Sequence, residues 1–231
     1  MDSLDNTHIM MVEDDAFIRR IFRHILSSLG IKITEAISGQ QAIAALSTHQ
    51  VELIITDIQM PRMNGLELIR QIRCGNTDAP RNQRVIVITS LSNSEVLGTA
   101  INLNINGFLV KPITPAMAQN KISIALTEEL TIRPEIFYEQ INTNLDNILQ
   151  ATKKSASLLK PLRSEGSKGS EGVTIPLQKL KSGMQLYSAL QTKSGFVILP
   201  AGQVLNDNMV KRIIELIDTI EGTEAQIEKH L

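Results

Sequence analysis

The stretch LIITDIQMPRMNG, residues 53–65, carries an apolar run that ends at Asp57 and is followed by two breaks in regular structure, Met60-Pro61 and Asn64-Gly65. An aliphatic, β-branched run of this length predicts a strand buried on both faces of a parallel sheet. In open α/β sheets, ligands bind and react outside the carboxyl ends of the strands. Asp57 lies at that end. It is either a functional carboxylate or a polar residue that merely stops the strand. The residues at the carboxyl ends of the other strands distinguish these two interpretations.

Strand and helix patterns alternate five times in the first part of the chain. Strands are expected at residues 9–12, 31–34, 53–56, 85–88 and 107–110. Helix starts are indicated by Ser38 with Gln41, by Asn64 with Glu67, and by Thr114 before a proline. Such alternation with short loops predicts an α/β fold, a parallel sheet covered by helices on both faces. Right-handed crossovers then favour the flavodoxin-like (βα)5 fold, with strand order 2-1-3-4-5.

Polar residues follow most of the predicted strands at their carboxyl ends. They are Glu13-Asp14-Asp15, Asp57, Thr89 and Lys111-Pro112. Three adjacent carboxylates suit either a solvated helix N-terminus, where the dipole favours negative charge, or a divalent cation site. Oxygen ligands without His or Cys suit a hard cation such as Mg2+. Asp57 could then act as a nucleophile toward a phosphoryl group, with the metal and Lys111 neutralising charge and Thr89 hydrogen-bonding the phosphoryl oxygens.

In these motifs and their spacing, residues 8–127 closely resemble the receiver domain of two-component response regulators. The resemblance implies that Asp57 accepts a phosphoryl group from a sensor histidine kinase or a phosphotransfer protein. It also implies a Mg2+ site in which Asp15 and Asp57 bind the ion and Asp14 acts mainly through water. The main-chain carbonyl of Gln59 would complete the protein ligands.

The same resemblance implies a two-state switch. Thr89 would be the switch hydroxyl, Lys111 the phosphate-binding lysine, and Phe108 the switch aromatic. Phe108 is also expected to be a core aromatic, and the two interpretations are compatible because burying the ring is how the switch works.

Composition limits the remaining possibilities. A chain of 231 residues suits one large or two small domains, and a formal net charge of -1 with mixed signs gives no electrostatic footprint for nucleic acid. The single cysteine, Cys74, excludes an internal disulfide framework and fits a reducing cytoplasm. The polar start of the chain is no signal peptide, and no apolar run is long enough to span a membrane. We therefore expect a cytoplasmic protein.

The second half is expected to contain three parts. Residues 128–162 form a connecting helix, with helical spacing from Pro134 to Lys160 that favours a packed or dimerising helix. Residues 163–172 are a flexible linker by composition. Residues 173–231 form a small α+β module, with strands at 173–175, 186–190, 196–199 and 203–205 and a helix capped by Asn206 or Asp207.

The module itself more weakly resembles a short unit that follows receivers in some regulators linked to cyclic-di-GMP phosphodiesterases. The His-Asp pair expected of such an enzyme does not occur in the sequence. We therefore expect no enzyme output but protein–protein interaction, with an unidentified downstream protein or a second copy of this chain as the partner. The alternative is a phosphorylation-controlled, DNA-binding transcriptional regulator. The late helix disfavours it, because Glu215, Asp218 and Glu221 accompany its basic residues.

Overall fold

The computed structural model describes residue 4 and residues 7–90, 94–150, 172–191, 197–217 and 224–228. The chain forms two compact units. The first contains residues 1–92 and 103–143, and the second contains residues 93–102 and 144–231. Each unit is considered by itself.

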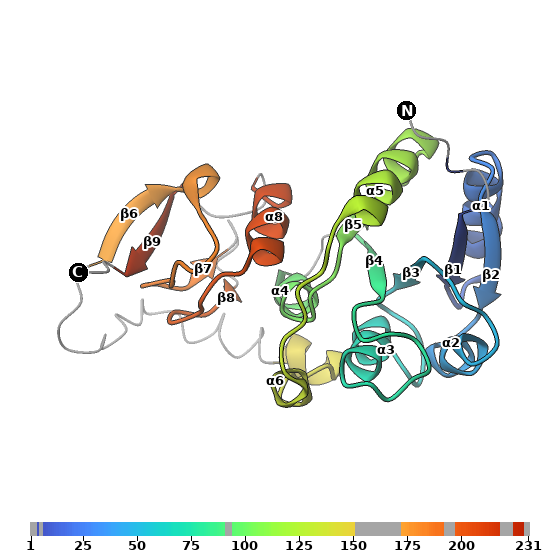
Figure 1. Cartoon of the computed structure of the whole chain (residues 1–231), viewed down its shortest axis with the longest axis horizontal. Helices are drawn as coiled ribbons and strands as arrows, with labels where there is room; N and C mark the ends of the chain where they lie inside the picture. Colours follow the sequence, from blue (N-terminus) through green and yellow to red (C-terminus); the bar gives the residue numbers. More distant parts are fainter. Residues whose placement is uncertain are drawn as a thin grey trace. The chain divides into compact units, whose positions relative to one another are not determined.

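The first unit contains a five-stranded parallel sheet with strand order β2-β1-β3-β4-β5, as predicted (Figure 1). Its strands are β1 (His8–Val12), β2 (Lys32–Ala36), β3 (Leu53–Asp57), β4 (Arg84–Thr89) and β5 (Gly107–Val110). Its helices are α1 (Ala16–Ser27), α2 (Gly39–Leu46), α3 (Gly65–Arg73), α5 (Pro115–Thr127) and the short α6 (Glu135–Glu139). In register, Asp57 at the end of β3 lies beside Ile88, one residue before the end of β4.

Helices α1 and α5 cover one face of this sheet, and α2 and α3 lie on the other (Figure 1). Alternate strand residues such as Ile9, Met11 and Ile55 pack with Phe22 of α1 and Ile122 of α5 in one buried cluster. Because the strands are buried on both faces, their sequences are nearly continuously apolar. The predicted caps are also formed. Side chains of Ser38, Asn64 and Thr114 accept hydrogen bonds from the backbone N–H groups three residues on.

The connecting region differs from the continuous helix predicted from Pro134 to Lys160. Helix α6 ends at Glu139, residues 142–144 are irregular, and helix resumes at 145–150. The remainder of the predicted helix and residues 163–171 of the predicted linker lie outside the described residues. The physical reason for the break is burial: Tyr138 is fully buried in the first unit, so the chain is fixed there by packing.

The second unit contains α4 (Ser94–Asn102), β6 (Gly172–Pro176), the 3-10 turn η1 (Leu177–Lys179), β7 (Leu190–Gln191), β8 (Val197–Leu199), α8 (Asp207–Glu215) and β9 (Glu224–Glu228). Strand β6 pairs antiparallel with β9, and β7 pairs antiparallel with β8. Asn206 caps α8, as one of the two predicted alternatives. The expected strands at 186–190 and 203–205 are reduced to β7 and isolated bridges at Leu186 and Val204.

Strand β9 was not predicted, because its sequence EAQIE is short and mostly polar. Its pairing with β6 supplies the hydrogen bonds that its own pattern does not indicate. Over the described part of the chain, no helix combines the length and apolar character needed to cross a membrane.

Candidate functional site

Asp57 is the last residue of β3 and is buried. Its Oδ1 lies 3.2 Å from Nζ of Lys111, and its Oδ2 accepts a hydrogen bond of 3.2 Å from the backbone N–H of Gln59. Burial raises the pKa of Asp57, and the nearby ammonium of Lys111 opposes that rise. A carboxylate is thus held beside a cation at the carboxyl end of the central strand, where the sequence predicted it.

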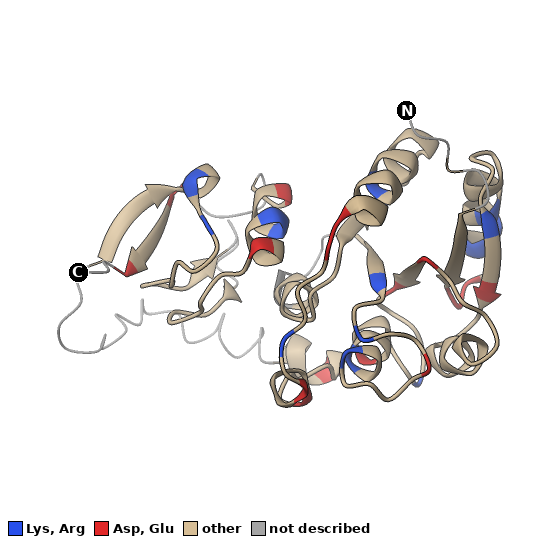
Figure 2. Ribbon diagram, viewed as in Figure 1, with Lys and Arg blue, Asp and Glu red and all other residues tan. Residues whose placement is uncertain are grey.

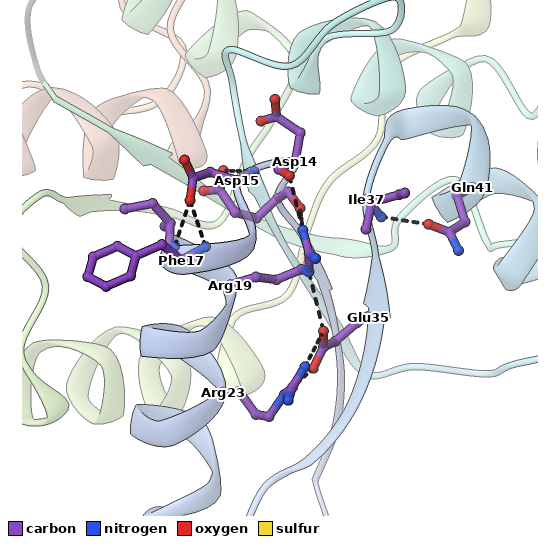
Figure 3. Close-up of polar contacts among 10 residues, drawn as sticks. Asp14, Asp15, Phe17, Arg19, Arg23, Glu35, Ile37 and Gln41 are labelled. Carbon is purple, nitrogen blue, oxygen red and sulfur yellow. Dashed lines mark hydrogen bonds and ion pairs between the residues drawn. The ribbon is translucent and has the colours of Figure 1, made fainter.

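Three carboxylates gather at this end of the sheet. Ligand oxygens of Glu13, Asp14 and Asp57 all lie within 4.8 Å of one another. The guanidinium of Arg19 donates to the main-chain oxygens of Glu13 and Asp14, at 2.9 and 3.1 Å. Because the same guanidinium lies 3.4 Å from Glu35, the turn after β1 is fixed between α1 and β2 (Figure 3).

Asp15, a predicted metal ligand, does not join this cluster. Its Oδ1 accepts from the backbone N–H groups of Phe17, at 2.7 Å, and Ile18, at 3.0 Å, so that Asp15 is the N-cap of α1 (Figure 3). These two hydrogen bonds lower the pKa of Asp15. The structure therefore does not place Asp15 among the carboxylates near Asp57, and Glu13 lies there instead. The missed signal was the N-cap position itself, directly before the helical residues 16–27.

The remaining predicted residues lie on neighbouring strands. Thr89 ends β4, and its main-chain oxygen accepts a 2.9 Å hydrogen bond from the backbone N–H of Lys111, just after β5. The Lys111–Pro112 peptide bond is cis. Phe108 in β5 is only 3% exposed, in agreement with its expected core position.

The residues present fit a divalent cation with oxygen ligands. Oε2 of Glu13 is buried without a hydrogen-bond partner, and the ammonium of Lys111 lies 3.7 Å from it. Burial, and secondly the charge of Asp57, raise the pKa of Glu13 to about 7. A buried carboxylate oxygen that lacks a hydrogen-bond partner and lies beside two further carboxylates is the environment that a hard cation stabilises.

Replacing Glu13 by Gln is expected to stabilise the metal-free protein near neutral pH by about 2 kcal/mol. The pKa of Glu13 is raised from 4.5 to about 7 on folding, so the free energy of unfolding falls as the pH rises between these values. A neutral glutamine escapes this loss, and the gain should vanish below the lower pKa. Urea unfolding with a chelator, at acidic and neutral pH, measures both effects.

The same Glu13→Gln variant should bind Mg2+ more weakly, because it lacks one carboxylate ligand. Glu129→Gln, at an exposed position of the same unit, is the control and should change neither property. A stability gain that is equal at both pH values would contradict the buried-carboxylate argument.

Comparison with known proteins identifies a family for the part of the chain that contains these residues. Residues 9–123 match the response regulator receiver domain family. The chemotaxis protein CheY1 of Helicobacter pylori is 32% identical over 120 residues, covering 51% of this chain and 95% of that protein. The probable transcriptional regulator ycf27 of Cyanidium caldarium is 27% identical over 181 residues, 70% of each chain. A solved structure described as a response regulator, from Chloroflexus aurantiacus, has a TM-score of 0.50 at 18% identity, covers 54% of this chain and 100% of its own, and bears on the fold alone.

Proposed function

This chain belongs to the response regulator receiver family, and from that premise we propose that a histidine kinase or phosphotransfer protein phosphorylates it on Asp57 in the presence of Mg2+. The observation that carries the proposal is a buried carboxylate, Asp57, that lies beside the Lys111 ammonium and two further carboxylates at the carboxyl end of β3. Receiver domains are signalling modules that accept phosphoryl groups from such donors.

The chemistry requires Asp57 to act as a nucleophile. Its carboxylate oxygen forms a bond to the phosphorus, the bond to the donor nitrogen breaks, and the donor imidazole regains its electron pair. Lys111, 3.2 Å from Asp57, neutralises charge on the incoming group. Glu13, Asp14, Asp57 and the main-chain carbonyl of Gln59 would hold Mg2+, which supplies charge neutralisation when bound.

The switch is proposed to use Thr89 and Phe108. Thr89 ends the strand next to Asp57, and this position supports a role for its hydroxyl in bonding a phosphoryl oxygen. Phe108 lies in β5 beside Val87 of β4 and is buried. We propose that a movement of Thr89 changes the packing of this ring.

For the output, protein–protein interaction through the C-terminal part is favoured over DNA binding. Helix α8 contains two basic residues, Lys211 and Arg212, between the acidic Asp207 and Glu215 (Figure 2). Arg212 is only 1% exposed, so Lys211 is the single exposed basic residue of this helix. A recognition helix needs a basic exposed face. The observation in favour of DNA binding is the likeness to the transcriptional regulator ycf27, which extends beyond the receiver match.

The function is tested by exposing the purified protein to a small phosphoryl donor with Mg2+ or with a chelator, and measuring the intact mass. We expect one phosphoryl group per chain with Mg2+ only. Uptake that is independent of the metal would overturn the proposed site.

Gel shifts of the phosphorylated protein with genomic fragments at two salt concentrations test the output. Sequence-specific binding would replace the proposal of protein–protein interaction.

A further inference from the structure

The chain that follows α5 forms a strap, residues 128–143, that is packed into the first unit. Its N-terminal part, residues 131–138, is held by aromatic and backbone contacts. Tyr138 is fully buried, its hydroxyl accepts a hydrogen bond from the backbone N–H of Arg133, and the guanidinium of Arg81 lies 6.0 Å from its ring. Asn104 donates to the main-chain oxygen of Thr131 at 2.8 Å. These contacts fix the strap over residues 131–138.

The C-terminal end of the strap, Thr143, is fixed at the first turn of α3. Thr143 is only 4% exposed, and its main-chain oxygen accepts a 2.8 Å hydrogen bond from Nδ2 of Asn64. Its hydroxyl donates to Glu67, which also accepts from Arg70 and Gln71. Although burial raises it, these hydrogen bonds together hold the pKa of Glu67 below its ordinary value. Thr143 is thus bound to the residues that begin α3.

Asn64 connects this anchor to the loop after Asp57. Its Oδ1 caps α3 by accepting from the backbone N–H of Glu67 at 2.9 Å, while its Nδ2 binds the strap. Gly65, the next residue, donates to the main-chain oxygen of Ile58 at 3.0 Å. A Cβ atom at Gly65 would lie 2.2 Å from the main-chain oxygen of Asp57, so no space separates α3 from the end of β3. A displacement of this loop must therefore move Asn64.

We propose that the Asn64–Thr143 hydrogen bond reports the phosphorylation state of Asp57 to the chain that leaves the first unit. The inference rests on the proposed function. A phosphoryl group adds volume and charge within the loop 58–64, whose close contact with α3 cannot absorb it. Asn64 is displaced and Thr143 loses its hydrogen-bond donor. The C-terminal end of the strap then loosens, while residues 131–138 stay fixed. Residues 145–150, which are helical, follow directly.

The experiment measures amide hydrogen exchange of the whole 231-residue chain with Mg2+, with and without beryllofluoride as the phosphoryl analogue. In the wild type, exchange within residues 139–144 should accelerate about two- to tenfold, the range for one lost hydrogen bond, when the analogue binds. Residues 131–137 should not change. Asn64→Ser keeps an N-cap oxygen but cannot reach Thr143. Its exchange at 139–144 should be fast without the analogue and rise no further.

Two controls make the test specific. Asn206→Ser makes the same change at the N-cap of α8, and Thr143→Ser keeps both the hydroxyl and the main-chain oxygen. Both should respond as the wild type does. If the analogue binds, by fluorine resonance, and exchange at 139–144 is unchanged in the wild type, the strap inference is wrong while the proposed function stands. If the analogue does not bind, the proposed function fails and the inference falls with it.

Discussion

Asp57→Asn is expected to abolish Mg2+-dependent phosphoryl uptake. An amide keeps the shape of the side chain and the hydrogen bond from Gln59, but it is neither a nucleophile nor a charged ligand for a hard cation. Intact mass after incubation with a small phosphoryl donor should show no added phosphoryl group. Asp78→Asn, at an exposed position in the same unit, is the matched control and should be labelled as the wild type is.

The stability of the Asp57→Asn variant shows whether labelling is lost because the nucleophile is missing or because the protein unfolds. The charge of Asp57 contributes to the raised pKa of Glu13, so the variant should lower that pKa toward its ordinary value. The metal-free variant should therefore be no less stable than the wild type near neutral pH. Labelling of the variant at the wild-type level would refute the assignment of Asp57. Loss of labelling together with unfolding would leave Asp57→Glu, labelled and analysed in the same way, to decide.

Most of the sheet could be predicted from the sequence because its signals are local. The five predicted strands end within two residues of the observed ones, and the caps at Ser38, Asn64 and Thr114 form the hydrogen bonds that their spacing indicates. Strand order followed from handedness rules that hold for any chain of this pattern. These predictions needed no knowledge of distant contacts.

The site was predicted less completely, because the direction of each of three adjacent carboxylates depends on which of them caps α1. Asp57 and Thr89 are the last residues of β3 and β4, Lys111 directly follows β5, and their positions followed from the strand ends. Which of the residues 13–15 turns inward depends on where α1 begins. Since Asp15 caps that helix, its carboxylate accepts from backbone N–H groups, and Glu13 and Asp14 are the acids that lie near Asp57.

The connecting region was predicted least well, because its conformation depends on partners far along the chain. The helical spacing after Pro134 is present, but helix α6 ends at Glu139. Tyr138 and Thr143 are buried there, and they contact Arg81 and Asn64, more than 50 positions earlier in the chain. Propensity is outweighed by such tertiary contacts. The same holds for β9, whose pairing with β6 no local pattern indicates.

A buried cation outside the site is expected to have the largest effect on stability. Arg73, the last residue of α3, is fully buried, and its guanidinium donates to four main-chain oxygens. They belong to Leu103 at 3.0 Å, Arg81 at 2.7 Å, Gln83 at 2.9 Å and Asn104 at 3.0 Å. Burial lowers its pKa to about 10, so Arg73 remains charged at neutral pH. The planar fork joins α3 to residues 81–83 and 103–104.

Arg73→Met should lower the free energy of unfolding by about 3 kcal/mol, because several buried oxygens lose their donors at once. Removing the buried charge offsets part of that loss, which keeps the estimate below the sum of the hydrogen bonds. Arg73→Lys should also destabilise the protein, since a single ammonium cannot reach all four oxygens. Arg23→Met removes an exposed ion pair with Glu35 and should cost less than about 1 kcal/mol. Urea unfolding of the three variants measures the difference, and equal losses for Arg73→Met and Arg23→Met would show that the buried guanidinium does not hold these segments together.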